Sequence, residues 1–351
     1  MMPKKILAIL MSICLIALIV PLNWTKAFAS ELSFSVETII PDNQINQNAT
    51  FFDLLMDVSQ KQTLQIRLAN NTDRDVVIVP EIATATTNHN GVVEYGVRDV
   101  ERDSTLRHAI QDIVTTKEEV IVPARGSYIL ELNVQMPAEK FAGILAGGIT
   151  LQEKEDENED LENQTGTGLA IANHFAYVVA IVLRNNESAV TPKLQLNNVF
   201  ADHINKRNVI KANIQNVMPM FMNQMSVHAR VMQQGSNSLL YESTSQSLQM
   251  APNSNMYYPI HLNGERLRAG TYDLELVVNS MGEEWRWTRE FTISAEEAAT
   301  LNAEDVTIAS TFPWTHTLIG VIIFLTVLLL WAVFAGKRRK PEDGGTDGHV
   351  R

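Results

Sequence analysis

The middle of the chain alternates between apolar and polar residues with a period of two. Four stretches show this clearly, namely Leu64 to Leu68, Tyr128 to Met136, Val227 to Val231 and Tyr272 to Val278. Successive side chains of a strand point to opposite faces of its sheet, so this pattern is typical of strands with one buried face. Many short strands separated by turn residues predict an all-β chain built of immunoglobulin-like β-sandwiches.

Two stretches predict hairpins. Asn90-Gly91 lies between two apolar runs and is the pair favoured in a type I′ turn. Seven of the ten residues 153–162 are acidic and predict a solvated loop, because like charges at this density repel one another. The strand-like segments 141–151 and 169–183 flank this run, so we interpret it as a hairpin loop within one domain rather than as a linker between two.

Helical signals in the middle of the chain are sparse. Asp103 or Ser104 is placed to cap a short helix whose apolar residues recur at helical spacing, namely Leu106, Ile110 and Ile113. Residues 295–301 predict a second short helix just after the last strand.

The first 29 residues predict a secretory signal peptide. Lys4 and Lys5 precede the apolar run 6–20, and Ala27-Phe28-Ala29 forms a small-residue cleavage site. An uncleaved N-terminal anchor is the alternative, although the run is short for a span of about 20 residues. Cleavage after Ala29 would remove Cys14, the single cysteine, and leave no thiol chemistry outside the membrane.

A second apolar run, 317–335, predicts one transmembrane helix over residues 314–336. No charged residue interrupts it, and at about 1.5 Å per residue it reaches roughly the 30 Å of a hydrocarbon core. Trp314 and Trp331 lie near its ends, and the basic cluster 337–340 marks the cytoplasmic side. The segment before the run lacks the pentapeptide of a sortase anchor, so we expect a single-pass type I membrane protein with its bulk in the cell-wall zone.

These signals together predict six segments. They are a signal peptide (1–29), a first β-sandwich (30–188, with the acidic hairpin loop 153–162), a second β-sandwich (189–294), a stalk (295–313), a transmembrane helix (314–336) and a basic cytoplasmic tail (337–351). Both predicted sandwiches are long enough for a core of their own.

Composition and charge exclude several classes of protein. The 351 residues are 45% hydrophobic and 19% charged, which is ordinary for a folded protein and unlike a disordered one. The net charge of −12 argues against a nucleic-acid binder. The exposed part is more acidic still, because eight basic but only three acidic residues lie in the signal peptide and tail. Bulk charge therefore cannot attract this protein to anionic wall polymers, and any wall binding needs a shaped site.

No catalytic, cofactor or metal motif was found, so we expect a protein that is not an enzyme, with no cofactor and no metal. The eight histidines are scattered, and none has another histidine three or four residues away. Asp156, Asn158 and Asp160 alternate, and a solvated loop is favoured over weak divalent-cation binding. Trp285 and Trp287 share one strand face, where core packing is favoured over a sugar-stacking platform. Residues 253–258 form a polar and aromatic patch that predicts a turn and the start of a strand.

The order of segments resembles the WxL-interacting proteins of Gram-positive bacteria. The resemblance covers most of the exposed chain and rests on eight stretches, which are FSVETIIPDNQ (34–44), FFDLLM (51–56), QTLQIRLANNT (62–72), ATTNHNGVVEY (85–95), FAGILAGGI (141–149), NVIKANIQN (208–216), APNS (251–254) and RAGTYDLEL (268–276). Val58-Ser59 stands where members of the family tend to carry Pro-Gly, a departure that alters one turn.

The resemblance implies a peptidoglycan-binding domain followed by a host-binding domain. It implies three partners, which are peptidoglycan, secreted proteins that carry the W-x-L motif, and host extracellular-matrix proteins in an adhesive role. The chain contains no W-x-L sequence, so it would be the interacting partner and not the W-x-L protein. The resemblance leaves the ligand-binding residues unknown.

Three functions remain open from the sequence. The favoured one is a non-catalytic binding protein anchored at the cell surface, because two sandwiches without a catalytic motif place their function on strand faces and loops. The second is a wall-acting hydrolase with an unrecognised pair of carboxylates, which needs only two acidic residues about 5–9 Å apart. The third is a transmembrane sensor, whose short tail would require a cytoplasmic partner.

Overall fold

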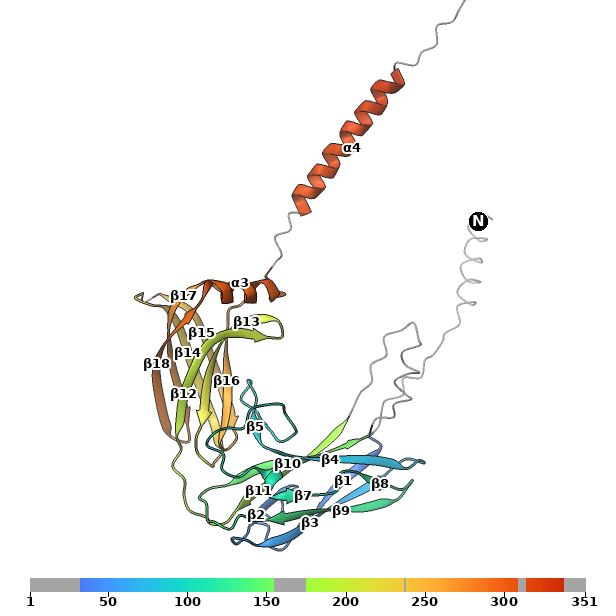
Figure 1. Ribbon diagram of the computed structural model, residues 1–351, viewed down its shortest axis with the longest axis vertical. Coiled ribbons are helices and arrows are strands. Elements are labelled where there is room, and N and C mark those ends of the chain that lie inside the picture. The colour runs from blue at the N-terminus through green and yellow to red at the C-terminus, as the bar shows by residue number, and fades with distance from the viewer. Residues whose placement is uncertain (1–31, 155–174, 237, 309–313, 338–351) are drawn as a thin grey trace, which may run out of the picture.

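The computed structural model describes residues 32–154, 175–236, 238–308 and 314–337 (Figure 1). The predicted signal peptide, most of the predicted acidic loop and nearly all of the predicted basic tail lie outside these residues. The described chain is mostly β, with two pairs of antiparallel-rich sheets, a small hairpin between them, and two α-helices near the C-terminus.

The first sandwich packs a four-stranded sheet on a five-stranded sheet. The first has the order β1 (Phe34–Ile39), β3 (Lys61–Asn70), β9 (Ser127–Gln135) and β7 (Val114–Thr115). The second has the order β2 (Phe52–Leu55), β11 (Ala176–Arg184), β10 (Leu145–Glu153), β4 (Val76–Thr84) and β8 (Val120–Val122). Inward positions two residues apart fill the core between them, among them Leu64, Ile66 and Leu68 of β3.

The second sandwich has seven strands. One sheet has the order β12 (Leu194–Ile204), β13 (Arg207–Asn216) and β16 (Ser254–His261). The other has the order β15 (Leu239–Met250), β14 (Met222–Gln233), β17 (Gly270–Ser280) and β18 (Glu283–Ile293). At the start of β17 the hydroxyl of Tyr272 donates to the carbonyl of Arg268 at 2.7 Å, a tyrosine corner of the kind found in immunoglobulin-like sandwiches.

The strands β10 and β11 flank the predicted acidic loop and are antiparallel neighbours from Leu145↔Leu183 to Gln152↔Ala176. At the loop end of β10, Glu153 forms an ion pair with Arg74 at 2.7 Å and accepts a hydrogen bond from Ser33. Each of the two strands has a further neighbour, because β10 also pairs with β4 and β11 also pairs with β2. The neighbouring strands β4 and β2 therefore stabilise the pair of β10 and β11 from both sides, independently of the loop.

Replacing residues 156–173 with a short Gly/Ser turn, while keeping Glu153, is expected to leave the first sandwich folded. The cost of closing a loop changes only slowly with its length, so we expect a change in the free energy of unfolding below about 1 kcal/mol. Thermal unfolding followed by circular dichroism measures it. Loss of the cooperative transition would show instead that this segment is needed to hold β10 against β11.

The turn before β3 contains the departure at Val58-Ser59. Ser59 has a φ of 55°, in the left-handed region, and its N–H donates to the carbonyl of Pro137 at 2.9 Å. A residue with a Cβ is strained in this conformation by about 1 kcal/mol, whereas glycine is not. A glycine at position 59 would therefore relieve strain in this turn.

Ser59→Gly is expected to raise the free energy of unfolding by up to about 0.5 kcal/mol, the relief of strain less the extra entropy of an unfolded glycine. Ser35→Gly is the control, because Ser35 lies exposed in the extended strand β1, where glycine should destabilise. Urea unfolding of both variants checks the prediction, which is wrong if both lower stability equally.

Two local predictions were wrong. The segment after Asp103 forms no α-helix, only the single 3₁₀ turn η1 (Ile110–Asp112). The hairpin of β5 (Thr86–Thr87) and β6 (Val93–Glu94) exists, but of Asn90 and Gly91 only Gly91 has a positive φ. A type I′ turn needs positive φ at both central residues, so this is a longer loop, closed by Asn88 N–H on the carbonyl of Val92 at 3.0 Å.

An interdomain elbow joins the two sandwiches, and in Figure 1 the β5 segment lies between them. The hydroxyl of Thr87 accepts from the N–H of Ala251 at 2.9 Å and lies 2.7 Å from the hydroxyl of Ser254. The N–H of Ile144 donates to the carbonyl of Pro219 at 2.8 Å. A small buried apolar cluster joins Ala85 and Ala146 of the first sandwich to Ala251 of the second.

A buried carboxylate forms the polar centre of the elbow. Asp103 is 7% exposed, and its oxygens accept hydrogen bonds from the amides of Gln215 at 2.9 Å and Asn255 at 2.6 Å. Beside it, the amide of Asn253 donates to the hydroxyl of Thr105 at 2.9 Å. Asp103 therefore binds the second sandwich instead of capping a helix.

The helix α3 (Ala295–Glu304) forms where the sequence predicted a short helix, and it begins at a capping box of Ser294 and Glu297. The side chain of Asn302 both donates to and accepts from the backbone of Leu267, each at 2.8 Å. Asp305 accepts from the N–H of Asn208 at 2.8 Å. The first part of the predicted stalk is thus attached to the second sandwich.

The helix α4 (Trp314–Lys337) follows. Among the residues that the structure describes, no helix was found that is long and apolar enough to cross a membrane. The span expected at residues 314–336 thus remains a prediction.

Candidate functional site

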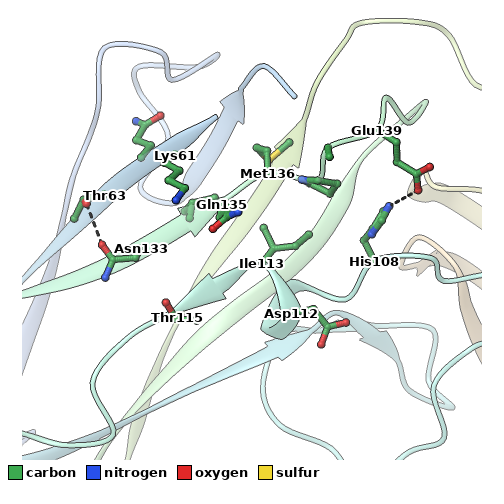
Figure 2. A pocket seen from close by; sticks show the side chains of 14 residues that line it. Lys61, Thr63, His108, Asp112, Ile113, Thr115, Asn133, Gln135, Met136 and Glu139 are labelled. Atoms are coloured by element: carbon green, nitrogen blue, oxygen red, sulfur yellow. Dashed lines mark hydrogen bonds and ion pairs between the residues drawn. The ribbon is translucent and has the colours of Figure 1, made fainter. Parts of the chain in front are cut away.

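A groove of about 1120 Å³ lies on the outer face of the four-stranded sheet of the first sandwich (Figure 2). We call it the sheet-face groove. Its floor is formed by the neighbouring strands β3, β9 and β7, and its wall by η1 with its flanking residues and by residues 137–139 after β9.

The floor presents polar side chains from three strands. In β3 and β9, Lys61 lies opposite Gln135 and Thr63 lies opposite Asn133, while Thr115 of β7 lies on the other side of Asn133. All five are exposed, because the alternate residues of these strands fill the core. The hydroxyl of Thr63 donates to the side-chain oxygen of Asn133 at 3.1 Å, which leaves the amide nitrogen of Asn133 without a partner among the described residues.

The wall is partly apolar. Ile113 and Met136 are buried behind the floor, and Pro137 and Ala138 line the rim. The turn η1 holds this wall in place, since Ile110 N–H donates to the hydroxyl of Thr84 at 2.8 Å.

The carboxylates of the wall already have side-chain partners. Asp112 is 3.1 Å from Arg102, and Glu139 is 3.2 Å from the Nε2 atom of His108, a contact drawn in Figure 2. Lys61 has no ion pair or hydrogen bond through its ammonium group within the described chain. The floor therefore offers one unpaired cation in a protein that is strongly acidic overall.

A smaller hollow of about 450 Å³ adjoins the groove and shares Thr115 and Asn133 with it. At its far end Lys117 donates to the hydroxyl of Tyr128 at 2.6 Å and lies 5.3 Å from the centre of that ring. This hydrogen bond raises the pKa of Lys117 above its usual value. Together the two hollows extend the polar surface along β9.

This arrangement suits non-covalent recognition of a polar ligand. Unpaired amides and hydroxyls bind ligand hydroxyls and amides, and a partly apolar wall accepts the less polar parts of the same ligand. Carbohydrates combine these properties in one molecule.

The other residues singled out from the sequence have structural roles. Trp285 and Trp287 are partly buried against the core of the second sandwich, as favoured above. Residues 253–258 form a turn followed by β16, as predicted, and Asn253 to Asn255 also hold the elbow. Asp156, Asn158 and Asp160 lie outside the described residues, among which no cluster of three or more metal-ligating side chains was found.

Sequence reasoning did not single out the floor residues of the groove. Lys61, Thr63, Asn133 and Gln135 are the polar positions of two alternating strands, and such positions ordinarily face solvent. These positions differ from ordinary strand positions because they lie beside the wall formed by η1. No local sequence pattern indicates that wall.

Comparison with known proteins gives two family matches. Residues 34–153 match the peptidoglycan-binding domain of the WxL Interacting Protein, and residues 166–303 match its host-binding domain. The second match includes β11, although β11 pairs within the first sandwich. A search of curated proteins found no match.

Solved structures that match this chain include three that contain a chaperone. One is the CsuC–CsuE chaperone–tip subunit complex of Acinetobacter baumannii, with 8% identity, a TM-score of 0.31, and coverage of 74% of this chain and 98% of that one. A Salmonella enterica complex of the SafA pilin with the SafB chaperone has 11% identity and a TM-score of 0.29. That match covers 76% of this chain and 99% of the other. The YadV chaperone has 10% identity and a TM-score of 0.28, and the match covers 74% of this chain and 100% of the other. With TM-scores this low, these similarities establish no relationship.

The two family matches together cover more than two thirds of the chain, in the order that the eight sequence stretches implied. Both matched families are binding domains. The chain belongs to the WxL-interacting protein family.

Proposed function

We propose that this protein is a non-catalytic, membrane-anchored binding protein of the cell surface, which attaches to peptidoglycan and partners secreted W-x-L proteins. The observation that carries the proposal is the succession of a peptidoglycan-binding domain, a host-binding domain and the helix α4. A protein of this kind needs binding surfaces at a fixed place and no catalytic centre.

The helix α4 supports the anchoring part of the proposal. It has 24 residues, and every described side chain from Leu318 to Leu328, as well as Trp331, is exposed. Exposed apolar side chains in such number are unfavourable in water and favourable in lipid. The first basic residue, Lys337, closes the helix on the side where the sequence continues with further basic residues.

The attachment of α3 brings the second sandwich close to this anchor. Asp305 and Thr307 are fixed by hydrogen bonds, and six residues separate Thr307 from α4. Even fully extended, that connection spans at most about 25 Å. The second domain would therefore meet secreted W-x-L partners near the membrane, and host contact would be secondary.

Removal of residues 309–351 is expected to release the protein into the culture medium. Removal of 341–351 alone is the control and should leave it with the membrane, because the apolar run and the basic cluster remain. Immunoblots of medium, wall and membrane fractions measure the distribution. Recovery of the full chain as covalently wall-linked material would exclude a membrane anchor.

The binding part is tested with the full chain in mild detergent. Purified peptidoglycan should sediment it, and a secreted W-x-L protein should be retained by it. Release of soluble sugar fragments from the peptidoglycan during the incubation would instead favour a hydrolase.

A further inference from the structure

We infer that the outer face of the five-stranded sheet in the first sandwich binds the secreted W-x-L partner, and that Glu81 on this face pairs with a basic residue of that partner. The inference rests on the proposed function, which names such a partner but gives it no contact surface. It adds the surface, the chemistry of the partner's complementary face and a role for one carboxylate.

The strands β4 and β11 are apolar on both of their faces. Their inward residues fill the core of the first sandwich, among them Ile78 of β4 and Ile181 of β11. Their outward residues are apolar as well, except for Glu81 and Arg184. A sheet with one face in water normally alternates apolar and polar residues, whereas strands covered on both faces are apolar throughout. These two strands therefore have the composition of a sheet that is covered on both sides.

The opposite outer face of the same sandwich shows the ordinary alternation. The outward residues of β3 from Lys61 to Arg67 are all polar, and so are those of β9 from Glu131 to Gln135. Ile129 is the one large apolar side chain that points outward from these two strands. The apolar outer face thus belongs to one sheet and is not a property of the whole domain.

The elbow covers only one end of this apolar face. Ala85 and Ala146 pack with Ala251 of the second sandwich, and a Cβ on Gly148 would lie 2.8 Å from the Cβ of Tyr95. Figure 1 shows the sheet of β4 and β10 on the side of the first sandwich that faces the second. The apolar face continues beyond this contact, so it extends an existing interface. A partner bound there can touch both domains, as the proposed function requires of the second.

The rest of this face, which we call the apolar sheet patch, is open to solvent. Its apolar members come from three strands and are Ile121 of β8, Val77 and Val79 of β4, and Ala176 and Val178 of β11. In the sheet Ile121 pairs with Val77, and Thr150 of β10 lies between Glu81 and Val178. Ile121 is 56% exposed and Val178 is 48% exposed, so the patch presents substantial apolar surface to water.

The apolar sheet patch has the dimensions of the centre of a protein interface. Four neighbouring strands about 4.8 Å apart span about 14 Å, and three outward residues along β4 span about 13 Å. Away from the elbow the patch ends at the ion pair of Lys154 and Glu119, whose charged atoms are 2.7 Å apart. Protein interfaces combine an apolar centre of this kind with a polar rim. A second polypeptide therefore suits the patch better than a hydroxyl-rich sugar strand.

The charge of Glu81 distinguishes between possible polypeptides. Its side chain is exposed beside Thr150 and has no ion pair or hydrogen bond within the described chain. A second copy of this acidic chain would bring a second Glu81 and more negative charge to the contact, and like charges across an interface are unfavourable. A Lys or Arg opposite Glu81 would instead form a charge-assisted hydrogen bond. The occupant is therefore a different polypeptide with an apolar face and one basic residue.

Three variants of the full chain in mild detergent test the inference against a purified secreted W-x-L protein. Val178→Lys places a charge in the patch, Glu81→Gln removes its carboxylate, and Ile129→Lys is the matched control on the polar outer face. Surface plasmon resonance at low and at high salt measures the dissociation constant. Thermal unfolding verifies that each variant is folded, and Ile121→Lys on the short strand β8 replaces Val178→Lys if that variant does not fold.

We expect Val178→Lys to weaken binding at least tenfold, because a charge would be buried where an apolar contact was made, and Ile129→Lys to leave binding unchanged. Glu81→Gln should weaken binding about fivefold at low salt and much less at high salt, since salt screens the charge pair. Equal binding by the native chain and the patch variants would exclude the patch, although the proposed function would stand. No binding by the native chain would overturn the proposed function and the inference with it.

Two further outcomes would give the patch a different occupant. A native chain that is dimeric in sedimentation equilibrium, with a monomeric Val178→Lys variant, would assign the patch to a second copy. The chain's own segment would be the occupant if Val178→Lys lowers the thermal midpoint of the native chain but not that of the chain with residues 156–173 replaced. Either result would overturn the inference.

Discussion

Asp103→Ala is expected to uncouple the two sandwiches without unfolding either of them. Asp103 belongs to the first sandwich, and the amides of Gln215 and Asn255 that bind it belong to the second. Removing the carboxylate leaves the buried amide of Gln215 and the half-buried amide of Asn255 without this acceptor, which costs about 3 kcal/mol at the interface. A single unfolding transition should therefore become two, and the solution scattering curve should show a wider range of shapes.

The apolar contacts of the elbow are too small to compensate for this loss. Its buried apolar core consists of three alanines, with Val93, Tyr95 and Phe221 packed at the edge. Apolar contacts over so small an area allow many relative orientations of the two domains, whereas directed hydrogen bonds fix one angle between them. The elbow thus determines how the sheet-face groove is presented relative to α4.

Asp99→Ala is the matched control, because Asp99 is exposed on the same segment and has no partner across the elbow among the described residues. It should unfold in one transition, like the native chain. Asp103→Asn should lie between the two, since it keeps the shape but brings an amide donor against two others. An unchanged single transition and scattering curve for Asp103→Ala would show that the carboxylate does not couple the domains.

Four of the eight family-like stretches meet at this elbow. Residues 85–95 carry Thr87, 141–149 carry Ile144, 208–216 carry Gln215, and 251–254 carry Asn253. The resemblance to the family therefore rests substantially on residues that hold two domains together. A motif of this kind is informative about architecture and silent about the ligand.

The elements that local patterns specify were predicted well. The strands β3, β9, β14 and β17 each bury alternate residues, so the period of two in the sequence directly reports their inner face. The helix α3 was predictable because Ser294 and Glu297 form a capping box within four residues.

The elements that depend on contacts between distant residues were not predicted well. Asp103 resembled a helix cap, but its partners lie more than 100 residues away in the other sandwich. The groove escaped prediction for the same reason. Lys61 and Gln135 look like ordinary solvated strand positions until η1, far from both in sequence, is placed beside them.

Gly147→Ala is expected to have the largest effect on the first sandwich and, through it, on the groove. A Cβ at Gly147 would lie 2.3 Å from the carbonyl oxygen of Ala83 and 2.7 Å from the Cβ of Ile110. The first clash is with the backbone of the neighbouring strand β4, so no rotation of a side chain relieves it, and the cost should reach about 3 kcal/mol. Gly96→Ala is the control, because its Cβ would meet only the Thr150 hydroxyl at 3.3 Å.

The displaced element in Gly147→Ala would be η1, because Ile110 is its first residue and packs directly on Gly147. Asp112 of the groove wall belongs to this turn, and His108 and Ile113 flank it. We therefore expect a lower midpoint in urea unfolding together with weaker sedimentation by peptidoglycan at temperatures where the variant is still folded. Lower stability with undiminished peptidoglycan binding would show that the glycan does not use the wall that η1 builds, and the ligand would then have to lie elsewhere on the first domain.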